Sequence, residues 1–461
     1  MKIAIIGAGW AGLSCAQKIK ELDSSSEITI FESARDAGGR AKGLNWKLSN
    51  GETVNIDNGQ HFVIGAYENT ITLLKKTNSP QWSENIFTWN FSNIDSNNKI
   101  YKKFELSMNC FFLNLFLSRN KWPRYWYFSL FISWLLIKLT FIKNKGTAKD
   151  WLSKAFQPKK LQEVFWRPFI ESTTNTDWRE ASAESLVTIL RECFIDFPRS
   201  ITILHPKVNL SKSGVNFIVK YLKKNGVNFR FGNTISSIKK KDAFFSCVNN
   251  KKLEYDKFDN VILALPSFSA QKLWEKSNFI ETSESRNWAL KKTRGINTLW
   301  IALPSNYKRI KKISNKNYWE IRQLSKLHNE SFFVIIERPL DQNRQIISIV
   351  HSAIDFKTIG IQKRNFEKIK IAAEGYLKSM FDLSLKNCEY KLITEKRATF
   401  ACQSQLSDAK KLWGNMHTGK KGIWRCSDDC IYGFPSTIES AVISGLNVAE
   451  SLMVKENQEH L

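Results

Sequence analysis

Three glycines near the start of the chain have the spacing that dinucleotide-binding proteins use to hold a pyrophosphate. They stand in the stretch Gly7-Ala-Gly-Trp-Ala-Gly12. We expect Gly7 to permit a tight turn, Gly9 to let the backbone approach a pyrophosphate, and Gly12 to allow a helix to pack closely on a strand. Glu32 follows about twenty residues after the last glycine, where a carboxylate can accept hydrogen bonds from the two hydroxyls of a ribose. Together these residues predict a dinucleotide site.

The sequence also predicts the strands and the helix that would position these residues. Residues 2–6 (KIAII) combine β-branched and small apolar side chains, which is typical of a strand buried on both faces of a parallel sheet. Apolar residues then recur at helical spacing up to the break at residues 23–26, and residues 28–32 form a second predicted strand. This order predicts a βαβ unit whose helix N-terminus faces phosphate groups.

The residues directly after Glu32 indicate which dinucleotide is bound. Residues 33–40 read SARDAGGR, which closely resembles the Gly-Gly-Arg extension of FAD enzymes in the amine oxidase and phytoene desaturase superfamily. The resemblance implies that the cofactor is FAD. Gly38 and Gly39 would free the backbone to pass beside it, and Arg40 would place a cation near the pyrophosphate. The alternative for Arg40 is a surface arginine on a loop.

The same resemblance implies that the chain returns to the cofactor near its C-terminus, with an acidic residue followed by a helix that points at the flavin ring. Asp428 fits the acidic position. Ser427 stands where the family would have glycine, and Asp429 is a possible substitute for Asp428.

Residues 436–439 (STIE) predict the start of that helix. Ser436 and Glu439 have the spacing of a capping box. The N–H groups at Thr437 and Ile438, together with the helix dipole, would stabilise negative charge on the N1–C2=O edge of the flavin. The alternative is a plain amphipathic helix.

Several stretches resemble a narrower family, the hydroxysqualene dehydroxylases, also called squalene-associated FAD-dependent desaturases. The matching stretches span nearly the whole chain: GAGWAGL at 7–13, DNGQH at 57–61, GAY at 65–67, Ala181-Ser182 within an expected helix, EKRATF at 395–400, and PSTIESAV at 435–442. The segment 426–430 departs from the Gly-Asp-Trp that the family would have there. The resemblance implies reductive removal of the hydroxyl of hydroxysqualene, which gives squalene for hopanoid and related triterpenoid biosynthesis.

This chemistry sets requirements for the site. An alcohol is a poor leaving group, so its loss as water needs a proton donor, and the carbocation-like centre then needs hydride, which reduced FAD can deliver. His61, one of 6 histidines, lies in DNGQH and is the candidate for an acid or a polar contact beside the flavin. A histidine that only holds a loop is the alternative. Lys396 and Arg397 would contact the cofactor or organise a domain interface. The electron donor stays unassigned.

The charge and one apolar segment indicate a lipid partner. Lys and Arg number 69 against 43 acidic residues, and the net charge of +26 would attract an anionic membrane surface. We expect no nucleic-acid partner, because no nucleic-acid-binding motif is present. Residues 125–142 (YWYFSLFISWLLIKLTFI), extended by 111–117, predict a helix that caps a substrate tunnel and dips into the membrane. A membrane span and a core helix are the alternatives.

The cysteines bear on compartment and metal binding. The 8 cysteines are too sparse for a disulfide scaffold, and the pair Cys426 and Cys430 lacks the second pair that a zinc site needs. We therefore expect a cytoplasmic, peripherally membrane-associated protein without a metal.

The sequence thus predicts an α/β fold in which a Rossmann-like FAD-binding domain with a parallel sheet is interleaved with an α+β substrate domain and a helical hydrophobic cap. We assign residues 1–90, 205–290 and 395–461 to the FAD-binding domain, 91–204 to the cap and membrane-facing part, and 291–394 to the substrate-domain sheet. Rival functions are a phytoene-type polyprenoid desaturase or an amine oxidase of the same fold, and a non-catalytic lipid-binding flavoprotein. We expect an isoprenoid lipid substrate, which distinguishes a hydroxysqualene dehydroxylase from an amine oxidase.

Overall fold

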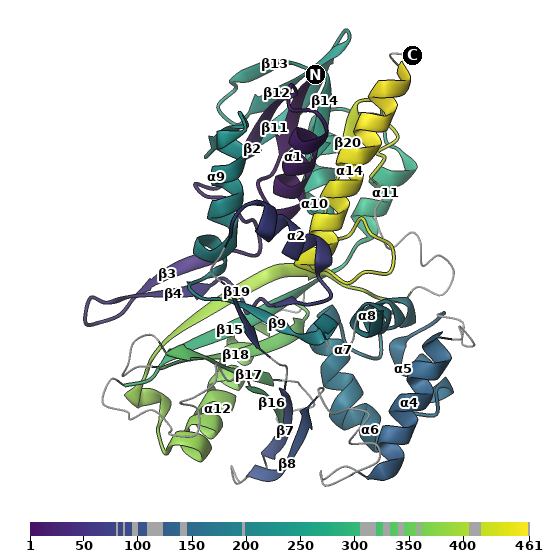
Figure 1. Cartoon of the computed structure of the whole chain (residues 1–461). Coiled ribbons are helices and arrows are strands. Elements are labelled where there is room, and N and C mark those ends of the chain that lie inside the picture. The colour runs from purple at the N-terminus through teal and green to yellow at the C-terminus, as the bar shows by residue number, and fades with distance from the viewer. Residues whose placement is uncertain are drawn as a thin grey trace.

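A five-stranded parallel sheet joins the N-terminal strand to strands from the middle and the last part of the chain (Figure 1). The computed structural model describes residues 1–79, 82–85, 88–94, 100–107, 123–138, 145–195, 199–304, 320–325, 332–339, 345–356, 361–404 and 416–459. The strand order is β10 (Asn228–Phe231), β2 (Glu27–Glu32), β1 (Lys2–Ile6), β14 (Asn260–Leu263) and β20 (Ile423–Arg425), and every neighbouring pair is parallel. The expected parallel sheet with its βαβ start is confirmed.

The central strand β1 is buried on both faces, as its composition predicts. Ile3 and Ile5 pack under α1 (Trp10–Leu22), α9 (Asn216–Lys224) and α14 (Ile438–Glu459). Ala4 and Ile6 face the opposite layer, made of α10 (Ser267–Lys276), α11 (Ser283–Leu290) and the antiparallel sheet of β11 (Ile235–Lys241), β12 (Phe244–Asn249) and β13 (Glu254–Phe258). Each fully buried isoleucine stabilises the fold by about 1.5–3 kcal/mol.

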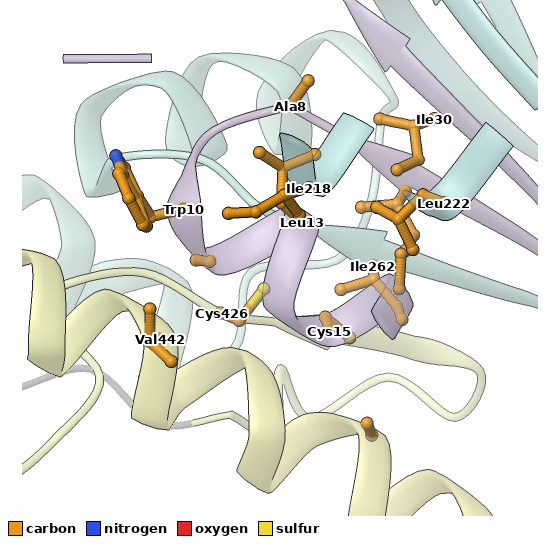
Figure 2. Packing of buried hydrophobic residues seen from close by; sticks show 14 of the residues in the cluster. Ala8, Trp10, Leu13, Cys15, Ile30, Ile218, Leu222, Ile262, Cys426 and Val442 are labelled. Carbon is orange, nitrogen blue, oxygen red and sulfur yellow. The ribbon is translucent and has the colours of Figure 1, made fainter. Parts of the chain in front are cut away.

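Helices α1 and α14 lie in close contact although they come from opposite ends of the chain. Val442 of α14 and Cys426 belong to the same hydrophobic cluster as the α1 residues Leu13 and Cys15, and Figure 2 shows Cys426 near Cys15. A Cβ atom at Gly445 would lie 2.3 Å from the Ala11 carbonyl oxygen, so only glycine allows the two backbones to approach this closely. The Ser14 hydroxyl also donates to the Val442 carbonyl at 3.2 Å.

A second, seven-stranded sheet lies below the first in Figure 1. Its order is β19 (Glu389–Phe400), β15 (Thr293–Ala302), β18 (Gln345–Ile354), β17 (Phe332–Pro339), β16 (Glu320–Ser325), β7 (Thr88–Ile94) and β8 (Ile100–Ser107), and only β16 and β7 pair in parallel. One face packs on α12 (Ile361–Phe381), and the other on the hairpin of β3 (Gly43–Lys47) and β4 (Thr53–Asp57). The sheet therefore takes strands from outside the range 291–394.

The remaining elements link the two sheets and form a helical region. A small antiparallel sheet is formed by β5 (Val63–Ile64), β9 (Ile203–Pro206) and β6 (Trp82–Asn85). Helix α2 (Glu68–Lys76) and the short turns Arg199–Ile201, Ser211–Val215 and Leu385–Asn387 complete the connections. The helical region comprises α4 (Arg124–Lys138), α5 (Ala148–Lys154), α6 (Lys159–Leu161), the π-helical turn Gln162–Trp166, α7 (Arg167–Thr174) and α8 (Ala183–Ile195). These helices bury one cluster around Trp126, Trp151 and Trp166.

Two expectations about this region need correction. Ala181 and Ser182 do not lie within a helix but precede α8, because the Ser182 hydroxyl accepts from the Glu184 N–H at 3.1 Å and so caps the helix start. The helix expected over residues 125–142 is described only as α4, whereas residues 139–142 and 111–117 lie outside the described residues. No described helix is both long and apolar enough to cross a bilayer.

The close contact of α1 and α14 can be tested with Gly445→Val. The valine side chain would meet the Ala11 carbonyl and the Ser14 hydroxyl, so we expect the free energy of unfolding to fall by about 2–3 kcal/mol. Glu450→Val places the same side chain on an exposed position of the same helix and should change little. Denaturant unfolding of the two variants checks this, and equal stabilities would contradict the packing described.

Candidate active site

A cavity of about 600 Å³ lies between the glycine-rich turn and helices α7 and α8. Its wall contains nearly all of the residues that the sequence singles out, although they come from three distant parts of the chain: Gly7, Gly9, Glu32, Gly38, Gly39, Arg40, His61, Asp428, Thr437 and Ile438. Gly12 is not part of the wall. Instead, a Cβ atom there would lie 2.1 Å from the Gly7 carbonyl oxygen, which fits its expected packing role.

The glycine turn forms an open cradle at one end of the cavity. Gly7 has a φ of +113°, and a Cβ atom there would lie 2.3 Å from the Ala264 carbonyl oxygen. A Cβ atom on Gly39 would lie 3.2 Å from the Cα atom of Gly9, so the two glycine loops pass against each other. Helix α1 begins after Gly9 without a side-chain cap, and its first N–H groups are therefore suited to an anionic ligand.

Glu32 both shapes this turn and lines the cavity. One carboxylate oxygen accepts the Ala8 N–H at 2.8 Å, and the other accepts the Ala34 N–H at 2.9 Å. The carboxylate is thereby held at the end of β2 in one orientation. A carboxylate has about four acceptor sites, so it retains capacity for a ligand hydroxyl.

Arg40 and Asp428 contact each other across the cavity wall. The guanidinium lies 2.5 Å from the Asp428 carboxylate and also donates to the Ala398 carbonyl at 3.0 Å. Burial lowers the pKa of Arg40, but the charge and hydrogen bond of Asp428, together with the charges of Asp429 and Glu395, make the net shift upward. Ser427, which replaces the expected glycine, donates to Asp428 at 2.8 Å. The ion pair joins the N-terminal loop to the C-terminal segment that precedes α14.

Asp429, considered above as a substitute for Asp428, is not in the cavity wall. Its carboxylate contacts Lys291 and lies 2.5 Å from Arg425, and all three side chains are almost completely buried. Burial raises the pKa of Asp429, but the charges of Arg425 and Lys291 prevail and lower it. This cluster anchors the loop after β20, which leaves Asp428 as the acidic residue that faces the cavity.

The capping box predicted for α14 is wrong by one residue. Thr437 and Ser440 form the reciprocal pair: the Ser440 N–H donates to the Thr437 hydroxyl at 3.1 Å, and the Thr437 N–H donates to the Ser440 hydroxyl at 3.0 Å. The Ser436 hydroxyl instead donates to Asp428. Because the Thr437 N–H is already bonded, the unpaired N–H groups of the first turn begin at Ile438.

Glu439 does not reach back to its own helix. Its carboxylate accepts the N–H groups of Asn69 and Thr70 at 3.0 and 2.9 Å and also their side chains, so it caps the N-terminus of α2. A carboxylate at that place stabilises the orphan N–H groups and the dipole of α2. The first turns of α14 and α2 are thereby tied together at the cavity.

His61 is a half-buried residue of the wall whose Nε2 atom is buried. Burial, and next the charge of Arg40, lower its pKa to about 4, so its imidazole is neutral near pH 7. A neutral imidazole supplies a polar contact rather than a strong acid. Among the described residues, the buried Nε2 atoms of His61 and Gln60 have no hydrogen-bond partner. Buried polar atoms are normally satisfied, so this stretch is suited to contact a polar ligand.

The wall opposite the glycine turn comes from α7 and α8, not from α4. Phe169 and Thr173 of α7 and Ile189 and Glu192 of α8 are in the wall, whereas no described residue of α4 is. The expectation that residues 125–142 cap the tunnel is therefore wrong for residues 125–138, the part of this segment that the structure describes. The reason is packing: Trp126 and other apolar residues of α4 are buried among the helices that support α7 and α8.

Two wall residues were not identified as candidates from the sequence. Tyr67 lies in the matched GAY stretch, and burial, followed by the charge of Glu439, raises its pKa far above the usual range. Glu192 had no sequence signal, because a single acid on an amphipathic helix is usually solvent-exposed.

Comparison with known proteins places the chain in a family. Residues 10–307 match the family model described as flavin containing amine oxidoreductase. The hydroxysqualene dehydroxylase of Zymomonas mobilis is 25% identical over 477 residues, which cover 97% of each chain. The zeta-carotene desaturase of Capsicum annuum is 40% identical over 76 residues, which cover 16% of this chain and 12% of the desaturase. The expected membership of the flavin-dependent amine oxidase superfamily is confirmed.

Solved structures show the same fold. Cyclohexylamine oxidase from Brevibacterium oxydans superposes with a TM-score of 0.70 at 12% identity, with 99% of each chain covered. An oxidoreductase from Methanosarcina mazei gives a TM-score of 0.70 at 14% identity, covering 98% of this chain and 100% of the other.

The cofactor of this protein is FAD, and the cavity fits it. The glycine cradle with the start of α1 suits a pyrophosphate, Glu32 suits a ribose, and the unpaired nitrogen atoms of Gln60 and His61 suit the polar edge of a flavin. The match of family model, fold and cavity shows that the chain belongs to the flavin-containing amine oxidoreductase family.

Proposed function

We propose that this FAD-dependent oxidoreductase reductively removes the hydroxyl of hydroxysqualene to give squalene. The observation that carries the proposal is the similarity over 97% of both chains to the Zymomonas mobilis hydroxysqualene dehydroxylase. The cavity is compatible with an oily substrate, because the part of its wall away from the glycine turn is largely apolar: Phe62, Phe169, Ile189, Ile203, Ile296 and Val350.

The residues of the chain would divide the work between cofactor and substrate. Bound FAD supplies hydride chemistry. Gly9, Glu32 and the N-terminus of α1 would hold its dinucleotide part, and the Ile438 N–H would stabilise negative charge at the flavin. The apolar wall would orient the hydrocarbon and exclude water, which prevents solvent from capturing a carbocation-like centre. His61 would act as a neutral polar contact.

Two rival activities share this cofactor and fold. A desaturase is favoured by the local 40% identity to zeta-carotene desaturase, which covers only 16% of this chain. An amine oxidase is favoured by the family model alone. Both rivals oxidise their substrate, whereas the proposed reaction reduces it. The direction of electron flow therefore separates them.

Mixing the anaerobically reduced protein with hydroxysqualene tests the proposed reaction. We expect the oxidised flavin spectrum to return while squalene forms in equal amount, because each hydride delivered leaves one oxidised flavin. Bleaching of the oxidised protein by phytoene or by an amine would instead support a rival. A protein that remains colourless after FAD is added would support a non-catalytic lipid-binding role.

Glu32→Gln tests the proposed dinucleotide site. Loss of the negative charge removes a charged hydrogen bond, usually worth about 1.5–3 kcal/mol, so we expect FAD to bind about 10- to 100-fold more weakly. Glu27→Gln, at the exposed start of the same strand, is the matched control. Flavin fluorescence titration of the two apoproteins measures the difference. An affinity within twofold of the unmodified protein would argue against a ribose contact at Glu32.

We further propose that the protein is cytoplasmic and binds an anionic membrane surface through α4 to α6. Figure 1 shows these helices at the end of the molecule away from the parallel sheet. Tyr125 and Phe128 of α4 are 57% and 59% exposed, and Phe156 after α5 is 82% exposed. Exposed lysines accompany them, including Lys154 and Lys159. Aromatic rings and cations of this kind suit lipid headgroups.

Phe156→Ser tests this membrane contact. Withdrawing one buried aromatic side chain from lipid loses about 1.5–3 kcal/mol, so we expect roughly tenfold weaker sedimentation with phosphatidylglycerol vesicles. Ile280→Ser removes an equally exposed apolar side chain, 86% exposed, from the parallel-sheet part and should leave binding unchanged. Binding that is insensitive to Phe156→Ser and to added salt would contradict the proposal.

A further inference from the structure

Helix α8 contributes one acidic side chain to the cavity wall. Thr188, Ile189, Glu192 and Cys193 all line the cavity, and their spacing places them on one face of the helix. The other face of α8 is anchored in the helical core through Leu186 and Leu190. Glu192 is therefore held in the wall by a packed helix, on the same face as the apolar Ile189.

The other carboxylates of the cavity wall already have partners. Glu32 accepts two backbone N–H groups, Asp428 is paired with Arg40, and Glu439 accepts four hydrogen bonds from Asn69 and Thr70. Glu395 faces the positive charge of Arg40. Such partners favour the ionised carboxylate. Within the described part of the chain, Glu192 is the wall carboxylate for which no cation or hydrogen-bond donor is found.

The surroundings of Glu192 favour its neutral form. Burial, followed by the negative charges of Glu439 and Glu68, raises the pKa of Glu192. The other titratable wall residues beside it are Tyr67 and Cys193, and burial raises the pKa of both, that of Cys193 to about 12. Neither of these two groups carries charge near pH 7, and no cation is among the described groups whose charge acts on Glu192.

We propose that Glu192 is the catalytic acid that protonates the departing hydroxyl of the substrate. This rests on the proposed dehydroxylation. The O–H bond of Glu192 breaks as its proton passes to the substrate oxygen, the C–O bond breaks with its electron pair leaving as water, and the hydride from reduced FAD completes the new C–H bond. Glu192 is left as a carboxylate beside the electron-poor carbon, which it stabilises, and it regains a proton from solvent afterwards.

The charges around Glu192 differ from those around Arg40. Arg40 is paired with Asp428, and the charges that act on Glu192 are those of Glu439 and Glu68. Glu439 is held by its hydrogen bonds to α2 and repels negative charge on Glu192. A carboxyl group without a cationic partner is better suited to donate a proton to a poor leaving group.

Glu192→Gln tests the proposal, with Glu184→Gln as the control two turns earlier on α8 and outside the cavity wall. We expect the reoxidation rate of the reduced protein by saturating hydroxysqualene to fall at least about 100-fold in Glu192→Gln, as for removal of a general acid. FAD affinity and KM should change less than threefold, since the amide keeps the shape of the side chain. Glu184→Gln should react like the unmodified protein.

Two further measurements distinguish an acid from a structural residue. A hydroxysqualene acetate ester, whose leaving group needs less protonation, should react with Glu192→Gln at close to the unmodified rate. In the flavin-free protein, infrared spectroscopy over a pH series should detect a protonated carboxyl band that persists above the ordinary range of a glutamic acid and that Glu192→Gln lacks. The rate of dehydroxylation should decline as pH rises through the pKa of that band.

The outcomes separate failure of this proposal from failure of the proposed function. If the unmodified protein converts hydroxysqualene and Glu192→Gln converts it equally fast, Glu192 is not the acid although the function stands. A variant that loses the ester reaction as well, or an infrared band unaffected by the substitution, overturns the assignment in the same way. If the unmodified protein does not convert hydroxysqualene although the infrared band is present, the proposed function is wrong. The assignment of a protonated carboxyl group to Glu192 then still holds.

Discussion

The close contact between α1 and α14 is the constraint on which the active site depends. The glycine turn and the residues Asp428 and Ile438 can line one cavity only if the last helix lies against the first, and Gly445 permits this by removing the side chain that would meet the Ala11 carbonyl. The partly buried Arg40–Asp428 ion pair then joins the loop after β2 to the segment before α14. The cofactor site and the packing of the fold therefore share the same contacts.

Charged neighbours act differently on two titratable residues of the cavity wall. The charge of Arg40, after burial, helps to lower the pKa of His61, which therefore makes a polar contact as a neutral ring. Burial and the charges of Glu439 and Glu68 raise the pKa of Glu192. The direction of each shift follows from the sign of the neighbouring charge and from burial.

In the helical region, the helices that line the cavity differ from the helix that packs behind them. Helices α7 and α8 supply the wall of the cavity, while α4 packs behind them and leaves Tyr125 and Phe128 exposed. Helix α4 therefore has two apolar sides: Trp126 is buried against neighbouring helices, and the rings of Tyr125 and Phe128 are exposed. This arrangement accounts for a segment that looks like a tunnel cap in sequence, although none of its described residues lines the cavity.

Much of the fold and cofactor chemistry could be predicted from the sequence, because the signals are local. The glycine spacing, the apolar strand at residues 2–6 and the Gly-Gly-Arg stretch indicate a parallel sheet and FAD through backbone conformation and short-range periodicity. Tertiary structure alone decided that Thr437 rather than Ser436 caps α14, that Glu439 caps α2, and that Glu192 faces the cavity. These choices depend on which distant groups packing brings within hydrogen-bond distance, and spacing along the chain does not determine that.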